Sequence, residues 1–185
     1  MWRRMVVIGV LVSSGVAGAA DPFWLDAPLK NWNQVGMTVP KAPTADADPV
    51  LVKRCHQDPR PPASAGDRAL VAAGWWLVGP LQLYGDTALL LASADVDGMC
   101  RPMKMQGFVF VGDRLAGTLS PDLMDSRADG SVTQWRLYDA TTIAAEFARY
   151  KDSDPLCCPS AKTGVMYSIT GGAKQPLLAP TSSGE

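Results

Sequence analysis

Two adjacent cysteines, Cys157 and Cys158, stand between prolines in the stretch "SDPLCCPSAKTG". Adjacent thiols could act as a redox pair, could contribute to a metal site, or could each form a disulfide with a distant cysteine. The chain has two further cysteines, Cys55 and Cys100. A redox pair of the thioredoxin type would have two residues between its cysteines and would lie in a βαβ unit, and the sequence shows neither feature.

We expect structural disulfides. Adjacent residues of an extended segment point to opposite sides, so the two sulfurs could reach different partners. The sequence therefore predicts that Cys157 and Cys158 each pair with one of Cys55 and Cys100. A bridge from Cys100 to either neighbour would close a loop of nearly 60 residues, which is worth about 4 kcal/mol in the chain-entropy model. A vicinal redox pair and a metal site remain as alternatives.

Metal ligands are scarce in this sequence. His56 is the only histidine, and it lies next to Cys55, which is poor spacing for chelation. The acidic stretches "SADVDGMC" and "MDSRADGS" suggest calcium loops, but the glutamate position of an EF-hand would fall on Lys104 or Arg136. Turn formation is the simpler interpretation of both stretches. We expect no metal site and no cofactor.

The remaining residues that could carry chemistry form a polar set: Arg101, Arg114, Asp125, Arg127 and Asp154. They could form ion pairs that hold loops together, which we favour, or they could line a pocket for an anionic ligand. The sequence has no G-x-S-x-G motif for a nucleophilic serine. We expect a binding or scaffolding domain without catalysis. The enzymatic alternative is a carboxylate-based hydrolase of envelope material, which would use Asp125 with Asp97 or Asp154.

The elements that must position these residues are mostly strands. Ser64 and Asp67 have the spacing of a capping box, and Gly74 is a natural helix end. One short helix is therefore expected between Ser64 and Gly74. Apolar segments of strand length follow, and a turn at Gly112 and Asp113 joins two of them. Residues 141–150 fit a helix or a strand, and we favour the strand. The predicted fold is a β-rich α+β domain with a single, mostly antiparallel sheet of six or seven strands, stapled by disulfides.

The sequence divides into four parts. Residues 1–20 have the charged start, the short apolar run and the small residues of a signal peptide. Residues 21–63, called the arm below, are rich in proline and should form a long irregular segment that docks in part on the core through Phe23, Trp24 and Trp32. Residues 64–170 should form the globular domain, and residues 171–185 a flexible tail.

Signal cleavage predicts an exported chain, periplasmic or secreted, with no stable membrane anchor. Removal of residues 1–20 leaves 15 basic residues against 18 acidic ones. This balance argues against nucleic acid as a partner, because phosphate binding needs a surplus of Lys and Arg. The expected partner is an envelope ligand or protein whose identity the sequence does not indicate. Export also places the cysteines in an oxidising compartment, where disulfides persist.

Several stretches, in order, resemble the LppP/LprE family of exported bacterial proteins, whose named members are lipoproteins: "GWWLVGPLQLYG", "DGMCRP", "GFVFVGDRLAGTLSP", "MDSRADG" and "RYKDSDPLCCPS". The similarity covers roughly residues 55–169. It implies export and a disulfide-bearing domain, and it supplies no catalytic residues. Members of that family carry a lipidated cysteine near the N-terminus, whereas this sequence has none there, so membrane attachment is not expected to carry over.

Overall fold

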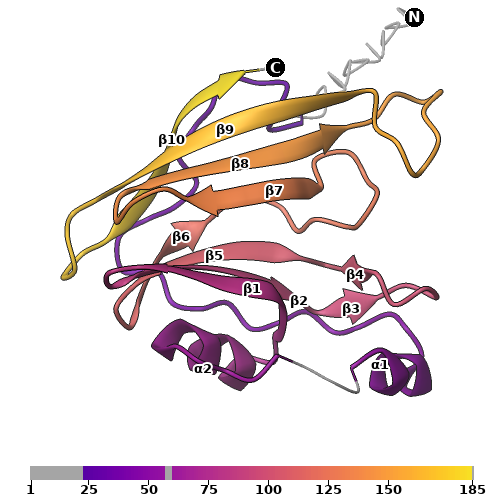
Figure 1. The fold of residues 1–185 in the computed structure, drawn as a ribbon, viewed down its shortest axis with the longest axis horizontal. Coiled ribbons are helices and arrows are strands. Elements are labelled where there is room, and N and C mark those ends of the chain that lie inside the picture. The colour runs from indigo at the N-terminus through magenta and orange to yellow at the C-terminus, as the bar shows by residue number, and fades with distance from the viewer. Residues whose placement is uncertain (1–22, 57–59, 185) are drawn as a thin grey trace, which may run out of the picture.

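A computed structural model describes residues 23–56 and 60–184 (Figure 1). The signal peptide expected at residues 1–20 lies outside this range. The described residues contain two helices, α1 (Pro49–Cys55) and α2 (Ala65–Ala72). No helix in this part of the chain is long and apolar enough to cross a bilayer.

Within residues 23–56 and 60–184, ten strands form three antiparallel sheets. The first has the order β1 (Trp76–Tyr84), β2 (Thr87–Ser93), β5 (Gln106–Val111) and β6 (Arg114–Thr118). The second has the order β10 (Leu177–Gly184), β9 (Ala161–Thr170), β8 (Thr142–Arg149) and β7 (Val132–Leu137). The third pairs β3 (Asp95–Val96) with β4 (Pro102–Met103).

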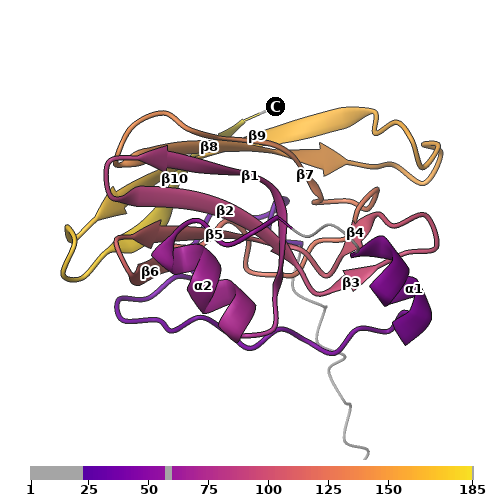
Figure 2. The same cartoon turned by 60° about the horizontal axis from the view of Figure 1, so that its bottom comes forward.

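The two four-stranded sheets lie one above the other, and the main core fills the space between them (Figure 1). Leu89 and Val109 contribute from the first sheet, and Phe147 and Tyr167 from the second. A second core lies on the opposite face of the first sheet, where α2 covers it (Figure 2). Both faces of the first sheet are therefore buried, which explains why every residue of β2 is buried.

The prediction of one sheet of six or seven strands with one helix is wrong. The loop between β6 and β7 crosses from the first sheet to the second. Before it, β1, β2, β5 and β6 therefore belong to one four-stranded sheet, and the strands after it belong to the other. One link between the two sheets is a side chain: Gln82 of β1 donates to the Trp135 carbonyl and accepts from the Leu137 N–H of β7. Residues 177–184, for which a flexible tail is expected, pair with β9 as β10.

Several local predictions are confirmed. Ser64 and Asp67 form the capping box of α2, and Gly74 follows the helix with φ of 91°. Gly112 and Asp113 form the two-residue turn between β5 and β6. Residues 142–149 form a strand in which Ile143, Ala145 and Phe147 all face the core.

The arm packs along the domain. Trp24 lies edge-on against Phe147, with ring centroids 5.0 Å apart, and Trp32 donates from Nε1 to the Thr118 carbonyl at 3.1 Å. Asn33 is only 4% exposed, and its side chain pairs with the backbone N–H and C=O of Thr118. The arm then runs past α2 towards α1, beside β3 and β4 (Figures 1 and 2). Because Asn33 fills the space beside Gly117, a Cβ at that position would collide with it.

Candidate functional site

The five polar residues singled out in the sequence are not brought together. Arg101 forms an ion pair with Asp97 in the turn between β3 and β4. Asp125 accepts a hydrogen bond from the Lys104 backbone N–H at 2.7 Å. Asp154 lies in the connection between β8 and β9, where it accepts from two backbone N–H groups. Arg127 follows Asp125 in the β6–β7 loop with φ of 64°, and Arg114 begins β6.

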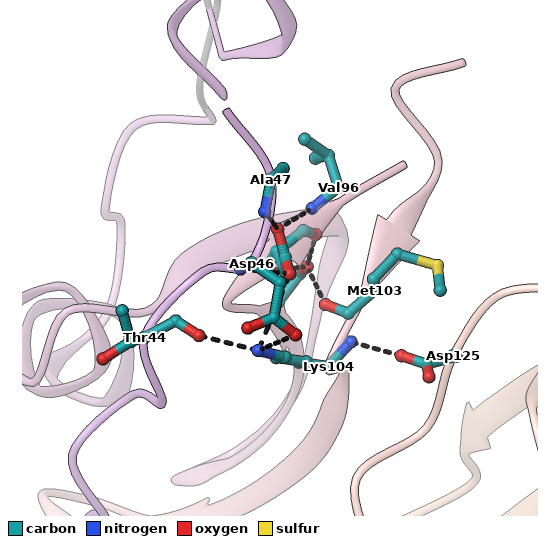
Figure 3. Close-up of polar contacts among 9 residues, drawn as sticks. Thr44, Asp46, Ala47, Val96, Met103, Lys104 and Asp125 are labelled. Atoms are coloured by element: carbon teal, nitrogen blue, oxygen red, sulfur yellow. Dashed lines mark hydrogen bonds and ion pairs between the residues drawn. The ribbon is translucent and has the colours of Figure 1, made fainter. Parts of the chain in front are cut away.

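A cluster of polar contacts surrounds Lys104, between β4 and β5, and we call it the Lys104 network (Figure 3). It contains Thr44, Asp46, Asp95, Lys104 and Asp125. Lys104 Nζ donates to the Thr44 carbonyl at 2.7 Å and forms an ion pair with Asp46 at 2.8 Å. A second carboxylate, that of Asp95, lies 3.7 Å from the same nitrogen. The network therefore joins the arm to the segment that links β4 and β5.

Asp95 organises the other side of this network. Its carboxylate is buried, with the residue 4% exposed, and accepts hydrogen bonds from the backbone N–H groups of Asp46, Ala47 and Val96. Ser93 Oγ lies 2.7 Å from both the Asp95 and the Met103 carbonyl oxygens, so its single O–H can donate to either and holds the start of β3 against β4. The three N–H donors of Asp95 are backbone groups that the fold has already positioned, and the Lys104 ammonium adds a side-chain charge at 3.7 Å.

The protonation states of Asp95 and Lys104 favour a structural role for the network over a catalytic one. Burial alone would raise the pKa of Asp95, but the three N–H donors and Lys104 outweigh burial and hold the pKa below its ordinary value. The ion pair with Asp46 raises the pKa of Lys104. Asp95 is therefore ionised and Lys104 protonated near neutral pH, so neither group is suited to exchange protons with a substrate there.

Replacement of Asp95 by asparagine is expected to lower the free energy of unfolding at pH 7 by about 1–3 kcal/mol, because the amide repels part of the donor set and leaves Lys104 less well compensated. The depressed pKa also predicts a pH dependence. The contribution of Asp95 is fully present above the pKa of the unfolded chain, near 3.9, and is lost as pH falls through the lower pKa of the folded protein. Urea denaturation of the native protein and of Asp95→Asn, from pH 7 down to pH 3, measures the free energy of unfolding at each pH. An equal loss of that free energy with falling pH in both proteins would contradict the prediction.

A cavity of about 540 Å³ lies at the other end of the first sheet. Three segments that are distant in sequence line it: residues 35–39 of the arm, the β5–β6 hairpin and the β9–β10 loop. Phe110 and Leu115 are buried beneath it. Arg114 and Lys174 line it as exposed cations, and neither forms an ion pair with a described residue. Asp113 is the acidic residue among its lining residues. We call this the Arg114 cavity.

Sequence reasoning found Arg114 but missed its companion Lys174, and it missed the Lys104 network. Lys174 lies in a stretch that resembled a polar tail, and nothing in its local sequence indicates that β10 returns it to the β5–β6 hairpin. Asp46 lies in "TADADPV", which resembles solvent-exposed linker sequence. The sequence does contain an acidic residue in the arm, Asp46, and a lysine that could pair with it, Lys104. Such possible ion pairs are common on protein surfaces, so this one did not stand out.

The disulfides differ from the expected pairing. Cys55 bonds to Cys100, with Cα atoms 5.2 Å apart, and Cys157 bonds to Cys158. The physical reason is position: Cys55 ends α1, which lies against β3, and Cys100 lies in the turn that follows β3. The neighbouring cysteines belong to the second sheet, in the connection between β8 and β9. Within the described residues, no group of three or more His, Cys, Asp or Glu side chains could hold a metal ion.

In a comparison with known protein families, residues 84–172 match the model of the family described as LppP/LprE lipoprotein. The matched segment runs from the end of β1 to the β9–β10 loop, and it includes Arg114, Asp125 and both vicinal cysteines. No curated protein and no solved structure shows a match to the chain. The family match confirms the resemblance found in the sequence and is consistent with an exported protein.

Proposed function

We propose that this chain, whose residues 84–172 match the model of the LppP/LprE lipoprotein family, is a periplasmic or secreted protein of the bacterial cell envelope that binds an anionic amphiphile without catalysis. The Arg114 cavity is the binding site in this proposal. One observation carries it: two exposed cations without ion-pair partners among the described residues line a cavity together with the buried apolar residues Phe110 and Leu115.

The lining of the cavity favours this class of ligand. Apolar side chains of the arm and of the first sheet, including Met37, Val39 and Leu115, would pack on an acyl or alkyl group. Arg114 can donate two parallel hydrogen bonds to a carboxylate or phosphate, and Lys174 adds a second positive charge. The acidic side chain of Asp113 lies on the same hairpin and would favour a ligand with a single anionic group.

The hydrolase alternative receives less support from the geometry. A glycosidase pair needs two carboxyl groups facing one cleft, with the pKa of one raised. Asp97 and Asp154 lie in loops of different sheets, and hydrogen bonds lower the pKa of each of them. Asp125 accepts a backbone hydrogen bond in a third loop. These carboxylates have the contacts of residues that hold loops.

Decyl phosphate is a suitable probe, with decanol as the uncharged control. We expect the protein to bind decyl phosphate in isothermal titration calorimetry. The double substitution Arg114→Ala with Lys174→Ala should weaken that binding about tenfold or more, because each charge-assisted hydrogen bond is worth roughly 1.5–3 kcal/mol. Binding of decanol should change little. The matched control is Arg136→Ala with Lys151→Ala, which removes two exposed cations that do not line the cavity.

Two results would overturn the proposal. One is an equal affinity of the native protein and the Arg114→Ala, Lys174→Ala variant for decyl phosphate. The other is release of soluble products from isolated envelope material by the native protein, together with loss of that release in Asp125→Asn, since this would establish the hydrolase instead.

A further inference from the structure

The connection between β8 and β9 presents a disulfide on the surface of the protein. Cys157 and Cys158 are both exposed, and their Cα atoms are 3.8 Å apart. Leu156, immediately before them, is 69% exposed. The sulfur pair is therefore open to other molecules, in contrast to a bridge enclosed in a core.

This disulfide contributes little to holding the fold together. A disulfide stabilises a protein chiefly by closing a long loop in the unfolded chain, and a bond between neighbours closes almost none. The strands on either side are already joined, because β8 and β9 pair in register as far as Arg149 and Ala161. By comparison, Cys55–Cys100 spans 45 residues and connects α1 to the β3–β4 turn. A stabilising role therefore explains Cys55–Cys100 and leaves Cys157–Cys158 unexplained.

The loop that carries the pair is held by contacts that do not involve sulfur. The Asp154 carboxylate accepts hydrogen bonds from the backbone N–H groups of Lys151 and Ser160, both at 2.9 Å. The Tyr150 hydroxyl donates to the Leu156 carbonyl, and the Cys158 N–H donates to the Pro155 carbonyl. The two N–H donors lower the pKa of Asp154, so its carboxylate stays ionised and keeps both contacts at neutral pH. Opening the disulfide would leave this loop in place, with two thiols on adjacent residues.

We propose that Cys157–Cys158 is a redox-active site that exchanges a pair of electrons with an external dithiol. One thiolate of the dithiol attacks one sulfur of the pair, forms a mixed disulfide and releases the other cysteine as a thiolate, which takes up a proton. The second thiol of the dithiol then displaces the first cysteine. Both cysteines end as thiols and the dithiol as its cyclic disulfide, so two electrons and two protons pass to the protein. The reverse sequence oxidises a dithiol partner.

The test is a reduction series with dithiothreitol on the purified protein. Samples are quenched with acid and alkylated, and the thiols at each cysteine are counted by peptide mass spectrometry. We expect Cys157 and Cys158 to become alkylated at a dithiothreitol concentration about tenfold or more below that which opens Cys55–Cys100, because folding favours only the long-range bond. The melting temperature should not change when the vicinal pair alone is reduced.

The double variant Cys157→Ser with Cys158→Ser leaves Cys55–Cys100 as the disulfide of the protein. It should fold, keep the native melting temperature, and show no thiols at low dithiothreitol. The variant Cys158→Ser alone keeps one thiol and should lose the capacity of the reduced protein to capture phenylarsine oxide, a reagent that binds two adjacent thiols. Resistance of the vicinal pair at concentrations that open Cys55–Cys100, or a fall in melting temperature when the pair alone is reduced, would overturn the proposal.

Discussion

Replacement of both Cys55 and Cys100 by serine is expected to lower the free energy of unfolding by about 4 kcal/mol. The bond spans 45 residues, and the loss of loop closure over that span accounts for this magnitude in the chain-entropy model. The double substitution is preferred because a single one would leave an unpaired thiol. Guanidinium denaturation, followed by tryptophan fluorescence, measures the effect.

The matched control is the Cys157→Ser, Cys158→Ser variant, which also removes one disulfide and adds two hydroxyls. Its free energy of unfolding should stay within about 0.5 kcal/mol of the native value, because the bond it removes closes no long loop. Equal destabilisation in the two variants would contradict the structural role assigned to Cys55–Cys100.

Trp32→Ala is the second substitution with a large expected effect, a loss of about 3 kcal/mol. Trp32 packs edge-on against Trp24 and Tyr167, with ring centroids 5.2 and 6.4 Å apart. Its Nε1 also donates to the Thr118 carbonyl at the end of β6. Loss of the ring would open the core between the sheets to water where the arm covers it. The same denaturation measurement applies.

Two further variants separate the causes. Trp32→Phe keeps an aromatic ring but removes the N–H donor, and it should cost only about 1–2 kcal/mol. Val35→Ala changes a residue of the arm that is 49% exposed, so it should have little effect on stability. A Trp32→Ala protein as stable as the native one would show that the arm does not contribute to the folded core.

The features that could be predicted from the sequence are those that depend on neighbouring residues. The capping box of Ser64 and Asp67 is complete within four residues, and the turn at Gly112 and Asp113 needs only local backbone geometry. The alternation from Ile143 to Phe147 marks a strand with one buried face. Each of these signals gives the same answer whether the strands form one sheet or two.

The division into two sheets could not be predicted in this way. It depends on where the β6–β7 loop crosses from one layer to the other, and no residue type marks that crossing. The strand β10 was missed because its sequence, "LLAPTSSG", has two large apolar residues at its start, then Ala and Pro, and ends in small residues that are mostly polar. It is stable as an edge strand because β9 supplies the partner backbone. The tertiary contact decides its structure here, and local preference does not.

The candidate site shows the same limit. Arg114 could be identified as one member of a possible anion pocket, but its companion Lys174 is 60 positions away and reaches the cavity only because β9 and β10 form a hairpin. The disulfide pairing was mistaken for a related reason. The opposite directions of adjacent side chains permit two distant partners, but Cys55 and Cys100 lie side by side through the packing of α1 on β3.

The docking of the arm has a consequence for the order in which the protein folds. The segment that closes the core is made early in the chain, yet its contacts reach far ahead: Trp32 lies 86 positions before Thr118, and Asp26 lies 123 positions before Arg149. Such separations make loop closure costly and slow folding. Because the chain is synthesised from its N-terminus, the tryptophans of the arm would stay exposed until the strands that they pack against have formed. Completion of the fold therefore depends on the last strands to be made.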